Sequence, residues 1–206
     1  MSFRLPRQGS VENPLRLAVL ISGSGSGMEA LLKHQEERCC HTTKIVISNK
    51  EDALGLKKAE QRGIPAVAII PDSSSDREGH EREIDIILEK YEIEAVILSG
   101  YMRILSAWFV EKWEGRLLNI HPSLLPDFPG AHAHRDVIAA GAKVSGCTVH
   151  FVDTGVDSGR IIAQRSIPVS EDDTEFSLQE KVKKIEHTLY PEVIDAFAES
   201  RLQSFS

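Results

Sequence analysis

The chain has 206 residues, of which 41% are hydrophobic and 27% are charged, and its formal net charge at pH 7 is −7. This length is enough for one α/β domain with a full core, and no apolar run is long enough to span a bilayer. An acidic balance is unfavourable for holding a phosphate backbone over a broad surface, so we expect neither nucleic acid nor a membrane as a partner.

The first 14 residues carry charged and turn-forming side chains but no apolar core region, which predicts a disordered leader and not a signal peptide. Cys39, Cys40 and Cys147 form neither a disulfide framework nor a metal spacing, and an odd count suits a reducing compartment. We therefore expect a cytoplasmic protein, a monomer or homodimer, whose residues 15–206 form a single domain.

Apolar runs alternate with amphipathic segments along the first two thirds of the chain, a pattern typical of a parallel sheet covered by helices. The predicted strands are residues 15–22, 44–48, 66–70, 95–99 and 117–120. The predicted helices are residues 28–37, 52–62, 77–90 and 106–113. The fold class that follows is a three-layer, Rossmann-like α/β fold with about seven strands, mostly parallel and partly mixed.

The remaining elements make the sheet mixed. A short helix is predicted near residues 135–140, followed by strands at residues 147–152 and 160–169. The connection through residues 153–159 is too short for a helical crossover, so these two strands should be antiparallel. The tail at residues 175–200 is amphipathic and should pack back on the sheet through Leu178, Val182, Ile185 and Leu189.

A glycine-rich loop, residues 22–27 with the sequence SGSGSG, lies between the first predicted strand and the first predicted helix. Glycine allows a ligand to approach the backbone, and free amides at a helix N-terminus favour an anion, so the loop is a candidate phosphate cradle. It lacks the glycine spacing of the dinucleotide fingerprint and the lysine of a P-loop. A flexible first turn without a ligand remains the alternative interpretation.

Asn119 and His121 lie two positions apart at the end of an apolar run, before Pro122. In a strand, this spacing directs both side chains to the same side of the sheet, where a carboxamide and an imidazolium can stabilise one oxyanion. Asp157, in the loop between the last two predicted strands, is the best candidate for a carboxylate that keeps His121 protonated. The alternative is that His121 only satisfies a turn and Asp157 only caps one.

Other polar residues leave further possibilities open. His132 and His134 suggest a metal site with His121, although their spacing matches no zinc pattern. Arg103 and Arg77 are candidates for binding a ligand carboxylate, or are surface charges. Glu186 in the tail is a candidate for binding a substrate amine, although a lone helical glutamate is usually exposed.

Four segments carry a family resemblance: residues 21–26 (ISGSGS), 102–106 (MRILS), 118–126 (LNIHPSLLP) and 146–152 (GCTVHFV) followed by 156–159 (VDSG). With them the chain, from about residue 15 to residue 201, resembles the phosphoribosylglycinamide formyltransferases, folate-dependent enzymes of purine synthesis. The resemblance implies transfer of a formyl group from 10-formyltetrahydrofolate to the amine of 5'-phosphoribosylglycinamide, without a metal.

The resemblance also implies a role for individual residues. Asn119 and protonated His121 would hold the oxyanion, while Asp157 would orient His121 and assist proton removal through water. The substrate phosphoribosylglycinamide would contact Gly25, Ser26, Gly27 and Glu186. The folate would contact Arg77, Met102, Arg103, Ile104, Leu105, Asp153, Thr154, Gly155 and Val156.

Two departures from the family pattern concern substrate binding. Gly27 stands where the family usually has Asn, so a contact to the phosphosugar is expected to be lost. Asp127 stands where relatives often have a basic or neutral residue, and its charge should repel an anionic ligand at the pocket rim.

Three other functions share parts of this pattern. Methionyl-tRNA formyltransferase carries an additional C-terminal barrel domain, and formyltetrahydrofolate hydrolase carries an N-terminal regulatory domain, so we expect neither. A non-catalytic nucleotide-binding module would keep the glycine loop without the catalytic residues.

Overall fold

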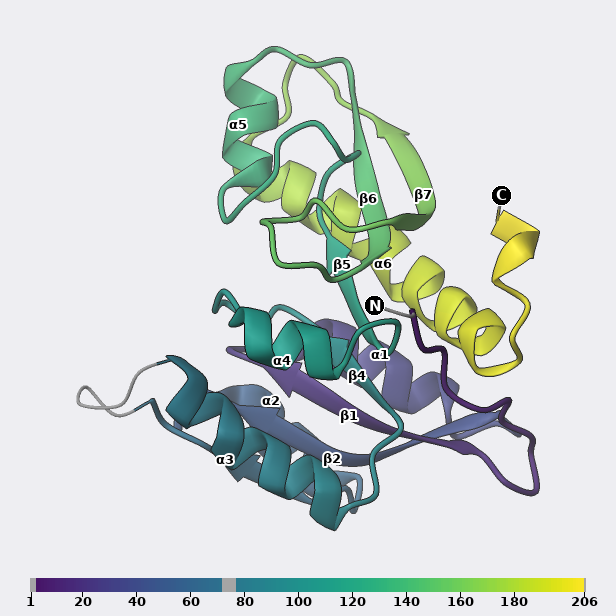
Figure 1. The fold of residues 1–206 in the computed structure, drawn as a ribbon. Helices are drawn as coiled ribbons and strands as arrows, with labels where there is room; N and C mark the ends of the chain where they lie inside the picture. Colours follow the sequence, from purple (N-terminus) through teal and green to yellow (C-terminus); the bar gives the residue numbers. More distant parts are fainter. Residues whose placement is uncertain (1–2, 72–76, 206) are drawn as a thin grey trace.

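The computed structural model describes residues 3–71 and 77–205, and it contains one seven-stranded sheet in the order β3-β2-β1-β4-β5-β6-β7 (Figure 1). The strands are β1 (Leu15–Ile21), β2 (His41–Ser48), β3 (Ala66–Ala68), β4 (Ala95–Leu98), β5 (Leu117–His121), β6 (Val144–Phe151) and β7 (Ile161–Pro168). β1 to β5 are parallel, whereas β6 is antiparallel to both β5 and β7. The predicted α/β class, the mixed sheet and the antiparallel last pair are confirmed.

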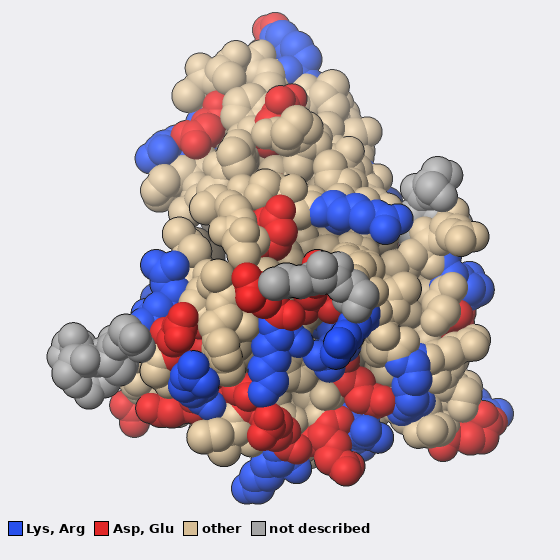
Figure 2. Space-filling view, viewed as in Figure 1, with Lys and Arg blue, Asp and Glu red and all other residues tan. Residues whose placement is uncertain are grey.

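The helices cover both faces of this sheet and are α1 (Ser26–His34), α2 (Leu54–Gln61), α3 (Arg77–Lys90), α4 (Ala107–Lys112), α5 (Ala133–Ala139) and α6 (Glu175–Ala198). A short 3-10 helix, η1 (Leu202–Phe205), follows α6. None of the described helices is long and apolar enough to cross a membrane. Over the face drawn in Figure 2, acidic and basic side chains are interleaved, and neither sign forms a broad patch of its own.

Side-chain alternation along β1 builds the two cores that make the fold three-layered. Leu17 and Val19 point into the core under α1, α2 and α6, whereas Ala18 and Leu20 point into the core under α3 and α4. All four side chains are fully buried, as expected for a central parallel strand covered on both sides. Burial on both faces fixes the register of the strand and thereby the position of the loop that follows it.

The described part of the predicted leader differs from the expectation of disorder. Residues 3–14 form no helix or strand, but Arg7 donates two hydrogen bonds to the carboxylate of Glu94, at 2.6 and 2.9 Å. The amide of Gly9 donates to the carbonyl of Ala198 at 2.8 Å, and a Cβ at Gly9 would lie 2.2 Å from the Cys40 carbonyl oxygen. These long-range contacts, invisible in the local composition, hold the segment against the sheet and α6.

Candidate active site

The site lies where the strand order reverses, between β1 and β4, at the carboxyl ends of the parallel strands. Ligands of open α/β sheets bind at this position because the loops leaving the two strands diverge and open a crevice. A cavity of about 600 Å³ is found here. It is lined by the glycine loop, the segment after β4, the end of β5, the loop between β6 and β7, and one face of α6.

The glycine loop forms one end of the cavity, with residues 23–27 in its wall. α1 begins at Ser26, two residues earlier than predicted, so the amides of Ser26 and Gly27 belong to the first turn and have no intrahelical partner. Gly25 adopts the left-handed conformation with φ 66°, and a Cβ there would lie 2.8 Å from the Gly55 Cα. Glycine is therefore required at this position, and the free amides form a site for an anion.

Ser99 occupies the space beside Gly27. A Cβ at Gly27 would lie 2.6 Å from the Ser99 hydroxyl oxygen, and Ser99 also lines the cavity. The Ser99 hydroxyl thus fills the space that a side chain at position 27 would need, and it provides a polar group beside the glycine loop. The exposed Asp127 does not line the cavity, so solvent screens its charge from a bound ligand.

The segment after β4 is held in place by a single serine. Ser22, at the end of β1, accepts a hydrogen bond from the Met102 amide at 2.7 Å and donates from its own amide to the Gly100 carbonyl at 3.1 Å. Met102 and Ile104 are more than half exposed at the mouth of the cavity, whereas Leu105 is buried. These side chains form an apolar wall for a planar ligand.

The carboxylate of Asp157 and the ring of His121 meet in the centre of the cavity. The Nδ1 atom of His121 lies 3.2 Å from Oδ2 of Asp157, and its Nε2 atom donates to the Phe128 carbonyl oxygen at 2.9 Å. The ring thus has an acceptor oxygen beside each of its nitrogens. Asp157 has φ 51° and accepts from the Gly130 amide at 2.8 Å, which fixes the carboxylate in this unusual backbone conformation.

Asn119 is oriented by His150, for which the sequence pattern predicted no role. Asn119 on β5 pairs directly with His150 on β6, and its side-chain amide nitrogen lies 3.3 Å from Nε2 of His150. Nδ1 of His150 donates to the Phe151 carbonyl oxygen at 2.9 Å, so Nε2 accepts from Asn119. Burial lowers the pKa of His150, which keeps this ring neutral. The 3.7 Å approach of Asp157 to the same nitrogen is therefore no ion pair.

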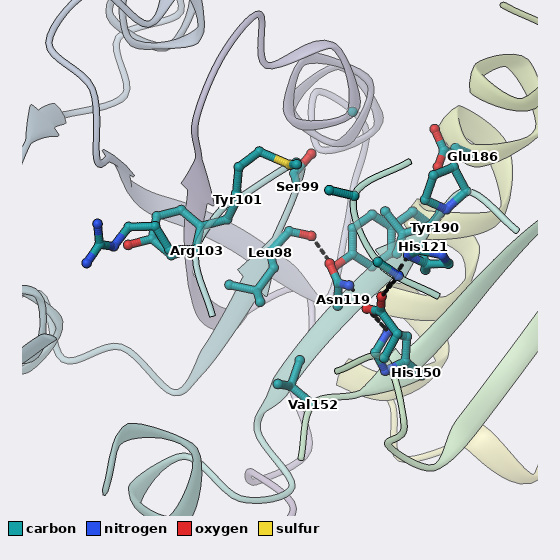
Figure 3. A pocket seen from close by; sticks show the side chains of 18 of the residues that line it. Leu98, Ser99, Tyr101, Arg103, Asn119, His121, His150, Val152, Glu186 and Tyr190 are labelled. Atoms are coloured by element: carbon teal, nitrogen blue, oxygen red, sulfur yellow. Dashed lines mark hydrogen bonds and ion pairs between the residues drawn. The ribbon is translucent and has the colours of Figure 1, made fainter. Parts of the chain in front are cut away.

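Figure 3 shows Asn119, His121 and His150 gathered around one point, with Glu186 beside them on α6 and Arg103 directed away from this group. The alternation predicted for β5 thus brings Asn119 and His121 to one cavity, and the loop before β7 brings Asp157 to them. The three predicted catalytic residues lie together, whereas Arg103 lines a distant part of the wall.

α6 supplies a polar stripe to the cavity wall. Gln179, Lys183, Glu186 and Tyr190 recur at spacings of four, three and four residues, and all line the cavity. This stripe lies beside the buried stripe that the amphipathic pattern predicted, so the same periodicity could have found it. Burial raises the pKa of Glu186 to about 7, although Lys183 opposes the shift. A carboxyl group that changes charge near neutral pH can exchange a proton with, or pair with, an amine.

Two predicted folate contacts are not brought to the cavity. Arg77 is exposed as the first residue of α3, and the exposed Thr154 lies in the loop whose neighbours Asp153 and Gly155 do line the cavity. His132, considered as a metal ligand with His121 and His134, is exposed at the start of α5 and lies outside the cavity.

Comparison with known proteins agrees with this geometry. The family model described as formyl transferase matches residues 15–194. The trifunctional purine biosynthetic protein adenosine-3 of Gallus gallus is 44% identical over 198 residues, which are 95% of this chain but 20% of that protein. The chain thus spans a fifth or less of the length of the trifunctional relatives it matches.

Single-function relatives match over nearly their whole length. The phosphoribosylglycinamide formyltransferase of Escherichia coli is 42% identical over 195 residues, covering 92% of this chain and 90% of that protein. The crystal structure of glycinamide ribonucleotide transformylase 1 from Symbiobacterium toebii has a TM-score of 0.89 and 42% identity, and the match covers 91% of this chain and 89% of that one. The chain therefore belongs to the formyl transferase family.

Proposed function

We propose that this protein transfers a formyl group from 10-formyltetrahydrofolate to the amine of 5'-phosphoribosylglycinamide, giving formylglycinamide ribonucleotide for purine synthesis. The observation that carries the proposal is the meeting of Asn119, His121 and Asp157 in one cavity that also contains the glycine loop. The named relatives support the same reaction, because proteins of this name match over most of the chain.

The proposed chemistry begins when the substrate amine attacks the formyl carbon. A C–N bond forms, and the carbonyl oxygen becomes an oxyanion that accepts hydrogen bonds from the Asn119 amide and from His121. His121 provides this bond when its Nε2–H turns from the Phe128 carbonyl oxygen to the substrate. Asp157 lies 3.2 Å from the other ring nitrogen and orients the ring.

Collapse of the tetrahedral intermediate completes the transfer. The bond between the formyl carbon and the folate nitrogen breaks, and the proton lost by the amine, moved by Asp157 through water, ends on that nitrogen. The overall reaction conserves protons and needs no oxidant.

The ends of the cavity suit the two substrates. The amides of Gly25, Ser26 and Gly27 are free to bind the substrate phosphate, and Glu186 is the wall group suited to the amine. The folate ring would lie along residues 102–105 and 153–156, where backbone groups and the apolar side chains Ile104, Leu105 and Val156 line the cavity. The free thiols of the described cysteines suit a reducing, cytoplasmic location.

The test is consumption of 10-formyltetrahydrofolate by the purified protein, with and without phosphoribosylglycinamide. The proposal expects turnover that depends on the amine substrate and yields its N-formyl product. Turnover without the amine would identify a formyltetrahydrofolate hydrolase instead. Substrate binding without any turnover would identify a binding module.

A further inference from the structure

A second cluster of chemically competent side chains lies outside the active site. His34 is the last residue of α1, Cys39 follows it, His41 begins β2, and Asp195 lies in the last turns of α6. One ligand atom from each of these four residues lies within 4.8 Å of all the others. None of the four lines the cavity described above, so the cluster is separate from the proposed chemistry.

Asp195 is the centre of the cluster. One of its carboxylate oxygens lies 2.7 Å from Nε2 of His34, and the other lies 2.9 Å from Nε2 of His41 and 3.3 Å from Sγ of Cys39. Sγ of Cys39 lies 3.2 Å from Nε2 of His41. Bond lengths of Zn²⁺ to nitrogen, oxygen and sulfur give tetrahedral edges of about 3.3 to 3.6 Å. The close pairs therefore need to separate by about half an ångström, and the widest pairs, which lie within 4.8 Å, need to close by up to about 1 Å.

We propose that His34, Cys39, His41 and Asp195 form a structural site for a divalent transition-metal ion, with zinc as its best occupant. Imidazole and thiolate ligands favour zinc over magnesium or calcium, which prefer oxygen ligands alone. Without metal, the Cys39 thiol donates to Asp195, and burial raises the pKa of this thiol. Metal binding therefore releases the thiol proton to solvent, and the resulting thiolate and the Asp195 carboxylate together neutralise a divalent cation. His41 is fully buried, whereas the side chains of His34 and Asp195 are about one third exposed and leave a path for the ion.

Gln35 contacts the ring nitrogen of His41 that faces away from the cluster. Nδ1 of His41 lies 2.7 Å from the side-chain amide nitrogen of Gln35, whose oxygen accepts from the Thr43 amide at 3.1 Å. Without metal, Gln35 donates to Nδ1 and the ring proton of His41 is on Nε2. Metal binding transfers this proton to Nδ1, and the Gln35 amide turns its oxygen toward the ring, as metal-bound histidines require. This turn breaks the hydrogen bond from the Thr43 amide to the Gln35 oxygen, and the loss of that bond lowers the affinity for the metal ion.

The metal would join three parts of the fold. α1 and β2 are consecutive elements, whereas Asp195 of α6 lies 154 positions after His41 of β2, and each element contributes at least one ligand to the cluster. Because such a site forms only in the folded chain, the ion stabilises the native state in proportion to its occupancy. At a free zinc concentration one hundred times Kd, we expect the Tm to rise by about 5 to 10 °C.

The experiment uses the full chain, freed of metal with a chelator and titrated with Co²⁺ and then with Zn²⁺. Tetrahedral Co²⁺ gives intense visible bands, and a bound thiolate adds a charge-transfer band in the near ultraviolet. This second band separates the proposed site from adventitious binding at the active-site histidines, because no cysteine lines that cavity. We expect one Co²⁺ per chain with both bands, displaced by Zn²⁺.

The variants Cys39→Ser and Asp195→Asn should weaken metal binding at least 100-fold and abolish the zinc-dependent rise in Tm. Cys40→Ser is the matched control, because its thiol is adjacent in sequence but contacts Glu199 instead of the cluster. It should bind Co²⁺ as the wild type does. The proposal is overturned if the wild type binds no stoichiometric metal, or if the thiolate band survives in Cys39→Ser. A fold check by circular dichroism on each metal-free variant precedes the titration.

Discussion

Replacement of Glu186 by Gln should make the protein more stable at neutral and alkaline pH. The pKa of Glu186 is about 7 in the folded protein, against an ordinary value of 4.5. This rise of the pKa from 4.5 to about 7 corresponds to a penalty of about 3 kcal/mol at most for the charged form, since one pKa unit is worth about 1.4 kcal/mol. Water in the cavity screens part of this penalty, so we expect a stabilisation of about 1 to 3 kcal/mol at pH 8.

The sign of the pH dependence follows from which state holds the proton more tightly. Below about pH 4.5 Glu186 is protonated in both the folded and the unfolded chain, so folding does not bury a charge at this position. As the pH rises from 4.5 to 7, the unfolded chain ionises first and the wild type loses stability. Above pH 7 the wild type bears the full free-energy cost of burying an ionised carboxylate, and Glu186→Gln does not.

Urea unfolding at a series of pH values, followed by the fluorescence of the buried Trp113, measures this difference. Glu192→Gln is the control, because Glu192 lies on the same helix with an exposed carboxylate paired to Arg165. The gap between Glu186→Gln and wild type should widen between pH 5 and pH 8, and Glu192→Gln should show no such widening. A gap that stays constant with pH would refute the assignment of a raised pKa to Glu186.

Substitutions at three further positions test the candidate site, and one at Tyr190 tests the packing that supports it. Asp157→Asn should lower kcat about 10²- to 10⁴-fold in steady-state assays while circular dichroism stays unchanged; a kcat near wild type would rule out its proposed role. His150→Leu should lower kcat by removing the acceptor that orients Asn119, and His150→Gln should restore part of the rate; equal rates in the two variants would contradict this positioning role. Gly25→Ala should raise KM for the phosphate-bearing substrate and reduce stability by about 1 to 2 kcal/mol, and an unchanged KM would remove the loop from substrate binding. Tyr190→Phe should cost about 1 to 2 kcal/mol in urea unfolding, because its hydroxyl lies within 3.0 Å of the Leu98 and Leu118 carbonyl oxygens.

Local periodicity predicted most of the fold, and the differences are at positions that tertiary contacts decide. β2 begins at His41 and not at residue 44, because residues 41–43 pair with β1 ahead of a register shift between Leu17 and Ala18. α6 continues through Pro191, which lies in a helix held by packing on both sides of the residue. Neither a bulge nor a tolerated proline can be inferred from residue spacing alone.

The candidate site was predictable to the extent that it depends on strand alternation. Asn119 and His121 follow from the period of two along one strand, and Asp157 from a short loop. The hydrogen bond between Asn119 and His150 depends on the register of β5 with β6, which residue spacing along one strand does not reveal. The proposed metal cluster was missed for a similar reason, because Asp195 is 154 positions from His41.

The two stripes of α6 restrict how this protein can change. Leu178 and Val182 anchor the helix in the core, and the neighbouring Gln179 and Lys183 line the cavity. A substitution that rotates or shifts this helix to admit a different substrate would also displace the core packing one residue away. New substrate preferences should therefore arise more easily in the exposed loops at the cavity mouth than along this helix, where one backbone serves both the core and the cavity wall.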